Sequence, residues 1–318
     1  MHTMISVVIP LYNKERSIIA TLESVLAQTY TDYEVIVVDD GSTDNSLKAV
    51  REKMSELGNG RIRVIHKENG GVCSARNCGI QESQGEYVAL LDADDILDKN
   101  YLQEQVKMIA DFPEAAMWGI NFAETNNGQL VRKLATGLPD GHRGYVENYF
   151  QMKGRISDLF CSSSVVIRKE VFDKVGMFDE RIKYAEDTDM WWRIIATHKV
   201  AFYDHYMVFY QWDAENRALQ RKVQLKNFLP YFVDKYQHSV FRQNKVFYQW
   251  VNQWSAQQLR CYYFTADRTM RQDAVVAVNN LDYSVIPFKY RLLYKYPYIL
   301  AVMMNRFDRW YHSRSFCK

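Results

Sequence analysis

The fold is decided by one stretch of the sequence, Val35-Ile36-Val37-Val38-Asp39-Asp40-Gly41-Ser42-Thr43-Asp44. Its first four residues, Val35 to Val38, are all β-branched, which is typical of a strand buried on both faces of a parallel sheet. Gly41 permits a tight turn after the strand, and Ser42 or Thr43 can cap a following helix. Apolar residues at helical spacing from Leu47 to Leu57 predict that helix. The stretch is therefore one strand, turn and helix of an α/β fold.

The same alternation extends on both sides of this stretch. Further strands are predicted at residues 5–9, 62–65 and 87–91, and further helices at residues 16–28 and 73–83. Pro10 ends the first strand, because it cannot donate to a sheet ladder. Such alternation implies a mostly parallel sheet flanked by helices, whose ligands bind outside the carboxyl ends of the strands. This rule directs attention to residues 10–15, 39–44 and 92–95.

The remainder of the chain changes character twice. Strand patterns at residues 116–122 and 163–167 mix with a helix pattern at residues 187–196. After residue 216 helical spacing dominates. We therefore expect an α/β domain over residues 1–215, made of the halves 1–100 and 101–215, followed by a mainly helical extension over residues 216–318.

The acidic cluster Asp92-Ala93-Asp94-Asp95 closes a buried strand. Carboxylates packed this tightly repel one another unless a cation is present, so a hard divalent metal such as Mg²⁺ or Mn²⁺ is the natural occupant. The alternative is an acidic turn with no ligand. The position at the carboxyl edge of the sheet favours the metal site.

Other polar residues fall at the same edge. Asp39 and Asp40 follow a strand, where a carboxylate can accept a hydrogen bond from a base or a ribose; an Asx-type turn is the alternative for one of them. Tyr12 can stack on a base and Arg76 can offset phosphate charge. Ordinary surface contacts are the alternative for both.

Several motifs occur in a fixed order: Val8-Ile9-Pro10-Leu11-Tyr12-Asn13, Val37 to Asp44, Ala75-Arg76-Asn77-x-Gly79-Ile80, Leu91 to Asp95, Ser163 to Arg168, Val175 to Glu180, and Glu186-Asp187-Thr188-Asp189. Together they resemble glycosyltransferase family 2, an inverting family with the GT-A fold. The resemblance spans about two thirds of the chain. It implies a nucleotide-binding half at residues 1–100, an acceptor-side half at residues 101–215, and transfer of a sugar from a nucleotide donor.

The resemblance also implies roles for single residues. It implies that Pro10, Tyr12 and Glu15 line the nucleotide pocket, that Asp40 reads the base and that Asp92 contacts the nucleoside side. Asn13 and Arg76 are also expected in the nucleotide-sugar site. Asp94 is expected to hold Mg²⁺ or Mn²⁺ against the diphosphate, and Asp187 to be the general base. Glu186 is expected to orient Asp187 or cap its helix, and Asp189 to cap the helix or face solvent.

The expected function is inverting transfer from a nucleotide donor, taken to be a UDP-sugar, to a hydroxyl of a glycan or lipid-linked glycan in surface polysaccharide synthesis. A catalytically silent nucleotide-sugar-binding scaffold and a sugar nucleotidyltransferase are the alternatives. Many relatives carry Arg and His in a mobile segment after the Glu186 helix, whereas the corresponding stretch here is Phe209 to Asp213. The sequence therefore does not predict how a loop closes over the donor.

The C-terminal extension is basic and aromatic. Residues 216–318 hold 17 Lys and Arg against 5 Asp and Glu, and residues 286–318 interleave Lys and Arg with Tyr, Phe and Trp. This composition suits an anionic lipid surface, with a helix packed on the catalytic domain as the alternative. Without a recognition motif, no nucleic-acid partner is expected.

The compartment follows from what the sequence lacks. Its five cysteines are scattered and form no Cys-x-x-Cys pair, which favours a reducing cytoplasm. We recognise neither a secretory signal nor a run of about 18 apolar residues. The expected location is the cytoplasm, with a peripheral position at the inner face of the cell membrane through residues 286–318.

Overall fold

The computed structural model describes residues 3–57, 60–126, 128–133, 136–152, 159–216, 224–237, 240–265 and 267–295. The chain forms two compact units, Met1–Arg221 and Lys222–Lys318. The sequence prediction places the division after residue 215. Within the described residues, no helix combines the length and hydropathy that crossing a membrane requires.

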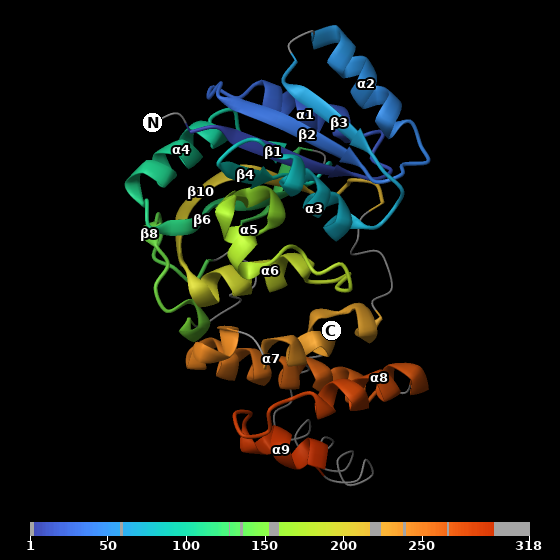
Figure 1. The fold of residues 1–318 in the computed structure, drawn as a ribbon, viewed down its shortest axis with the longest axis vertical. Coiled ribbons are helices and arrows are strands. Elements are labelled where there is room, and N and C mark those ends of the chain that lie inside the picture. Colours follow the sequence, from blue (N-terminus) through green and yellow to red (C-terminus); the bar gives the residue numbers. More distant parts are fainter. Residues whose placement is uncertain are drawn as a thin grey trace. The chain divides into compact units, whose positions relative to one another are not determined.

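One sheet runs through the first unit, with the strand order β3-β2-β1-β4-β9-β6-β10-β5 (Figure 1). In chain order the strands are β1 Ile5–Leu11, β2 Tyr33–Asp39, β3 Ile62–His66, β4 Tyr87–Leu90, β5 Ile96–Leu97, β6 Ala115–Asn126, β7 Gln129–Lys133, β8 Arg143–Tyr145, β9 Val165–Arg168 and β10 Lys199–Gln211. β1 to β4 pair in parallel, whereas β9 pairs antiparallel with both β4 and β6. The predicted α/β fold with a flanked sheet is confirmed.

Helices cover both faces of this sheet (Figure 1). The helices of this unit are α1 Ile18–Leu26, α2 Ser46–Leu57, α3 Val72–Glu82, α4 Tyr101–Asp111, α5 Glu170–Val175 and α6 Glu186–Thr197. Residues of α1, α2 and α4 share a buried core with Val7, Ile9 and Val35 on one face. On the other face, Ala75 of α3 packs with Ile36 and Val38. This alternation explains why the β-branched strands are buried on both sides.

Gly79 explains how closely α3 lies on the sheet. A Cβ placed on Gly79 would meet Cγ1 of Val8 at 2.3 Å and Cγ2 of Val38 at 3.3 Å. Only a glycine therefore fits at this point of the helix without a shift.

Pro10 lies within β1 and does not end it. Residue pairing with β2 continues to Leu11, whereas pairing with β4 stops at Val8. The carbonyl of Val8 accepts from Leu91 on the β4 side, and that of Leu11 accepts from Asp40 on the β2 side. The alternation of the strand turns Pro10 toward β4, where the ladder has already ended, so its missing N–H costs no hydrogen bond.

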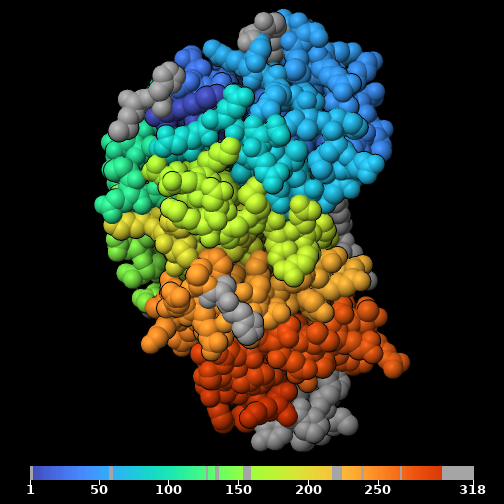
Figure 2. Space-filling model, viewed as in Figure 1, coloured from blue at the N-terminus to red at the C-terminus, as the bar shows by residue number. Residues whose placement is uncertain are grey.

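The acceptor-side half differs more from the prediction. The expected strand at residues 163–167 begins only at Val165, because Ser162–Ser164 form a 3₁₀ turn. Phe209 to Gln211 belong to the long strand β10 and pair with β6. Of the stretch that corresponds to the mobile segment of relatives, only Trp212 and Asp213 therefore lie beyond the strand. In Figure 2 the blue and cyan atoms of the first hundred residues form one continuous surface with the yellow-green atoms of α5 and α6.

The second unit is helical, which confirms the predicted extension. It contains α7 Lys245–Tyr263, α8 Arg268–Asn279, α9 Phe288–Lys295 and shorter 3₁₀ segments at Leu225–Asn227, Leu229–Tyr236 and Val240–Gln243. Tyr290 and Tyr294 of α9 are buried, and the hydroxyl of Tyr294 donates to the carbonyl of Ala256 at 2.6 Å. The rest of the predicted membrane-facing segment, residues 296–318, lies outside the described residues.

Candidate active site

A cleft of about 530 Å³ lies at the carboxyl edge of β1, β2 and β4. A volume of this order suits a ligand of nucleotide size. The lining includes most of the predicted site residues, namely Pro10, Tyr12, Asn13, Asp40, Arg76, Asp92, Asp94 and Glu186. Glu15 and Asp187 are described but do not line it. We call this hollow the sheet-edge cleft.

Asn13 and Glu15 connect the loop after β1 to the loop after β2. Asn13 adopts a left-handed conformation with φ of 52°, and its Oδ1 accepts from the amide of Thr43 at 2.8 Å. Glu15 is exposed, and its Oε2 accepts from the amide of Asn45 at 2.9 Å, just before α2. Both side chains therefore hold the wall of the cleft in place.

Asp40 is 2% exposed and binds the loop that precedes α3. Its Oδ2 accepts from the amide of Gly71 at 2.7 Å, and its Oδ1 accepts from the amide of Gly70 at 3.0 Å and from Nζ of Lys67 at 2.7 Å. Gly71 has a φ of 90° and caps α3, so the chain there requires glycine. Asp40 thereby presents the first turn of α3 to the cleft.

Asp39 has the turn-forming role that was one of its two interpretations. Its Oδ1 accepts from the amide of Ser42 at 3.3 Å, and its Oδ2 lies 2.6 Å from Nδ1 of His66 on β3. The side chain is fully buried, so it stabilises the turn without reaching the cleft.

Arg76 joins the two halves of the site. Its Nη2 donates to Oδ1 of Asp92 at 2.8 Å, and its Nη1 donates to Oε1 of Glu186 at 3.0 Å. The guanidinium also lies over the ring of Phe178, 5.4 Å from its centroid. Burial works against the charge of this side chain, but the two carboxylates raise the pKa of Arg76. Because both carboxylates hold the buried guanidinium, the position of Arg76 in the cleft is fixed.

Glu186 and Asp187 open α6, where the helix dipole favours negative charge. The preceding Ala185 has a left-handed φ of 61°, which turns the chain into the helix. Burial and the neighbouring Asp187 raise the pKa of Glu186 to about 7, against the opposing effect of Arg76. Burial also raises the pKa of Asp187, whose Oδ1 accepts from the amide of Thr188 at 2.6 Å. A carboxylate with a raised pKa suits proton transfer near neutral pH.

Asp189 has a structural role within the same helix. It is fully buried, and its Oδ2 accepts from Nε of Arg193 at 3.0 Å. Arg193 in turn donates to the carbonyls of Val175, Gly176 and Met177. The expected cap or solvent-facing role of Asp189 is wrong, because this ion pair fixes α6 to the segment before it.

Asp94 and Asp95 differ in their partners. Oδ2 of Asp94 lies 2.5 Å from Nζ of Lys14. Burial raises the pKa of Asp94, an effect that Lys14 opposes and Asp92 reinforces. Oδ2 of Asp95 accepts from the hydroxyl of Ser163, and burial together with the other two aspartates raises the pKa of Asp95 well above its ordinary range. The buried Asp95 therefore fixes the loop of residues 92–95 to Ser163.

The described acidic residues of the cleft do not form a complete metal site by themselves. The part of the chain that the structure describes contains no group of three or more Asp, Glu, His or Cys side chains arranged to hold an ion. Asp94 can supply one carboxylate ligand, while Asp92 is held by Arg76 and Asp95 by Ser163. One protein carboxylate would be enough for Mg²⁺ or Mn²⁺ only if the ion took its other ligands from a donor and from water. These carboxylates do not form a cage made by the protein alone.

A segment after β10 is bound to the loop after β1. Oε1 of Glu215 accepts from the amide of Arg16 at 2.9 Å and that of Ser17 at 3.2 Å, and Oε2 accepts from the Ser17 hydroxyl at 2.5 Å. Burial opposes ionisation of Glu215, but these hydrogen bonds lower its pKa. Asn216 donates to the carbonyl of Tyr12 at 3.3 Å. Residues far apart in sequence therefore border one cleft.

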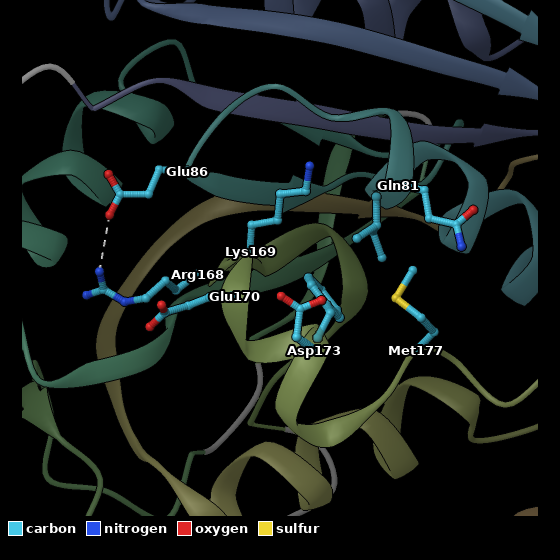
Figure 3. Close-up of a pocket in the computed structure, with 9 residues that line it drawn as sticks. Gln81, Glu86, Arg168, Lys169, Glu170, Asp173 and Met177 are labelled. Atoms are coloured by element: carbon cyan, nitrogen blue, oxygen red, sulfur yellow. Dashed lines mark hydrogen bonds and ion pairs between the residues drawn. The ribbon is translucent and has the colours of Figure 1, made fainter.

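Another hollow lies at the opposite edge of the sheet and is shown in Figure 3. It has a volume of about 280 Å³ and lies where Arg168 of β9 pairs with Tyr87, the first residue of β4. Arg168 donates to Glu86 at 3.3 Å, and Lys169 donates to the carbonyl of Ser83. Its basic groups are committed to the protein, so the sheet-edge cleft is the better site.

Several lining or supporting residues were not predicted from the sequence. Lys14 and Lys183 line the cleft, and Ser163 donates to Asp95 and accepts from the amide of Asp92 at 3.0 Å. Ser163 lies in a motif that indicates a strand and the family resemblance, but neither predicts its contact with Asp95. Glu215 carries no local signal, because its partners lie about 200 positions earlier in the chain.

Comparisons with known proteins identify the fold and the family of the chain. The crystal structure of Staphylococcus aureus TarS 1–349 in complex with UDP-GlcNAc matches with a TM-score of 0.73 and 20% identity, covering 98% of this chain and 93% of that one. The match establishes the GT-A fold. A model described as glycosyl transferase family 2 matches residues 6–176, more than half of the sequence. The chain belongs to glycosyltransferase family 2.

Two curated relatives show the range of similarity. An uncharacterized glycosyltransferase of Rickettsia conorii is 30% identical over 216 residues, which is 67% of this chain and 35% of that protein. The Escherichia coli UDP-Glc:alpha-D-GlcNAc-diphosphoundecaprenol beta-1,3-glucosyltransferase WfgD is 37% identical over 132 residues, 41% of this chain and 50% of that one. The aligned part thus spans about a third to a half of these two relatives' own lengths.

Proposed function

We propose that this protein transfers a sugar, with inversion, from a nucleoside diphosphate donor to a hydroxyl of a glycan or lipid-linked glycan during surface polysaccharide synthesis. The observation that carries the proposal is the bridge from Asp92 through Arg76 to Glu186. It sets a donor-side carboxylate and the start of α6 around one cleft. A UDP-sugar is the proposed donor, because WfgD is named for UDP-Glc and TarS is described with UDP-GlcNAc.

The donor would bind along the loops after β1 and β2. Tyr12 and Pro10 line that part of the cleft and are proposed to contact the base, together with Asp40. Asp92 is proposed to contact the nucleoside side of the donor, and Arg76, which donates to Asp92, to offset the charge of the diphosphate. Glu15 would not contact the donor itself but would hold the loop after β2 in position, because its carboxylate accepts from the amide of Asn45.

Asp187 is proposed as the general base. It would take the proton of the acceptor hydroxyl while that oxygen forms its bond to C1 of the sugar. The bond from C1 to the diphosphate oxygen breaks on the opposite face, and the nucleoside diphosphate leaves with the electron pair. Glu186 stays bound to Arg76 and keeps the first turn of α6 in position. One correctly placed base contributes about 10²- to 10⁴-fold to such a step.

Asp94 is proposed to hold Mg²⁺ or Mn²⁺ together with the donor diphosphate. When bound, the ion would neutralise charge that develops on the leaving diphosphate. The remaining protein cations that line the cleft, among them Arg76 and Lys183, reduce the repulsion that an incoming diphosphate meets from the carboxylates.

The reaction can be tested by supplying UDP-glucose or UDP-GlcNAc with a GlcNAc-diphospho-lipid acceptor and following both released nucleotide and lipid-linked product. Sugar transfer releases UDP and gives a β-linked product from an α-linked donor. An α-linked product would overturn inversion. Pyrophosphate formed from UTP and a sugar phosphate would indicate a nucleotidyltransferase, and donor binding without any product would indicate a silent scaffold.

We further propose a cytoplasmic location with peripheral binding at the inner membrane face through residues 286–318. The basic and aromatic composition of that segment supports the proposal. Because Tyr290 and Tyr294 pack inside the second unit, a truncation after residue 295 is a cleaner test than one after residue 285. Flotation with anionic liposomes should fall in the shortened protein, and equal flotation would remove the proposed role of residues 296–318.

A further inference from the structure

Lys14 places a fixed cation beside the carboxylate proposed to bind metal. Its Nζ lies 2.5 Å from Oδ2 of Asp94 and also donates to the carbonyl of Glu215. The Lys14 and Asp94 side chains are only 11% and 17% exposed. The pair is thus largely shielded from water, where a charge interaction is stronger than on an open surface.

The surrounding structure holds this ammonium in place. The amide of Lys14 donates to the hydroxyl of Ser46 at 2.8 Å, and the preceding Asn13 is locked in its left-handed conformation by Thr43. Glu215 is fixed in turn through its carboxylate, which accepts from the start of α1. The backbone of Lys14 and the residue Glu215 are therefore positioned by interactions that do not involve the ammonium itself.

The acidic cluster explains why a cation is needed there. Asp94 lies beside Asp92 and Asp95, and its nearest opposite charge is Lys14. A divalent ion on the same carboxylate would meet the positive charge of Lys14 at close range. The diphosphate of a donor would remove that conflict, because its oxygens can accept from the ammonium and bind the metal at once.

We propose that Lys14 occupies Asp94 in the donor-free protein and so makes metal binding depend on the nucleotide. The inference rests on the proposed metal role of Asp94. Lys14 is then a positioning residue: it keeps Asp94 paired until metal and diphosphate arrive together. A purely structural Lys14–Asp94 pair would stabilise the loop without controlling the metal affinity.

The test is the affinity for Mn²⁺, followed by electron paramagnetic resonance of the free ion with and without UDP. Without UDP, Lys14→Met should bind Mn²⁺ on the order of tenfold more tightly than the wild type, since the competing charge is gone. Addition of UDP should then improve the Mn²⁺ affinity less than it does in the wild type. Lys53→Met is the matched control, because Lys53 of α2 pairs with Glu23 of α1 at 2.7 Å and neither residue lines the cleft.

Unchanged or weaker Mn²⁺ binding by a folded Lys14→Met protein would overturn the inference. Lys14→Gln, which keeps a polar end without charge, serves if the methionine variant does not fold. Asp94→Asn separates this result from the parent proposal. If Asp94→Asn weakens Mn²⁺ binding while Lys14→Met leaves it unchanged, only the role of Lys14 is wrong. If Asp94→Asn has no effect, the proposed metal site itself is wrong.

Discussion

Nη1 of Arg76 lies 3.0 Å from Oε1 of Glu186, although the two residues are 110 positions apart in the sequence. Arg76 belongs to α3 and Glu186 begins α6, so this contact links the nucleotide-side and acceptor-side halves of the first unit. The same guanidinium holds Asp92 at the end of β4. The geometry of the proposed reaction therefore depends on one buried arginine.

Replacement of Arg76 by methionine should lower the free energy of unfolding by about 3–5 kcal/mol, because two part-buried carboxylates lose their shared partner. Urea denaturation measures the change. Arg63→Met is the control: Arg63 pairs with Glu82 at 2.9 Å on the surface and should cost less than about 1 kcal/mol. An equal decrease in the free energy of unfolding in both variants would show that the buried bridge stabilises the protein no more than the surface pair does.

Asp187→Asn should retain binding of UDP and Mn²⁺ but reduce sugar transfer by about 10²- to 10⁴-fold, since the amide cannot accept the hydroxyl proton. Calorimetric binding and the rate of UDP release check the two parts separately. Asp173→Asn, at an exposed position of α5, should keep full activity. Full transfer by the Asp187 variant would remove its assignment as the base.

The raised pKa of Glu186 predicts that the stability of the folded protein decreases as the pH rises. Its pKa is about 7 in the folded protein and its ordinary value is 4.5, so the folded state binds the proton more tightly between these values. Stability is therefore lost as pH rises from about 4.5 to about 7. Glu186→Gln removes this loss while its Oε1 can still accept from Arg76.

The melting temperature of Glu186→Gln relative to the wild type should therefore rise by a few degrees between pH 5 and pH 8. Glu170→Gln is matched to it, because Glu170 also begins a helix but is exposed. That control shows how much of the change comes from placing glutamine at the start of a helix. A Glu186→Gln difference that stays constant or shrinks over this range would contradict the raised pKa.

Gly79→Ala should destabilise the protein by about 1–3 kcal/mol, although alanine favours helices. The added Cβ would lie 2.3 Å from Cγ1 of Val8, a β-branched side chain in a central strand that cannot turn aside. Gly144→Ala, whose Cβ would meet nothing closer than 3.7 Å, is the control for denaturation experiments. Equal stability of the two variants would mean that α3 can move away from the sheet.

The nucleotide-side half could be predicted well from the sequence. Its strands are short and largely apolar, and loops at the ends of parallel strands must meet at one edge. That rule predicts that Asp40, Asp92 and Asp94 lie together, and all three line the cleft. The prediction that one residue of the Asp39–Asp40 pair forms a turn also holds, and that residue is Asp39.

The parts that were missed depend on contacts across long sequence separations. Lys14 meets Asp94 across 80 positions, and Glu215 meets Ser17 across 198. No local pattern reports such pairs. β10 was overlooked for a related reason: polar residues such as Asp204 and His205 interrupt it, and its strand conformation follows from pairing with β6.

We propose above all that the sheet-edge cleft binds a nucleotide sugar through Asp94 and a divalent metal. The most direct measurement is the melting temperature of the wild type and of Asp94→Ala with UDP-sugars, each with and without Mn²⁺. We predict that a UDP-sugar with Mn²⁺ raises the wild-type melting temperature by several degrees and that Asp94→Ala loses this increase. A wild type that no nucleotide sugar stabilises, or an Asp94→Ala variant that keeps the full increase, would contradict the account.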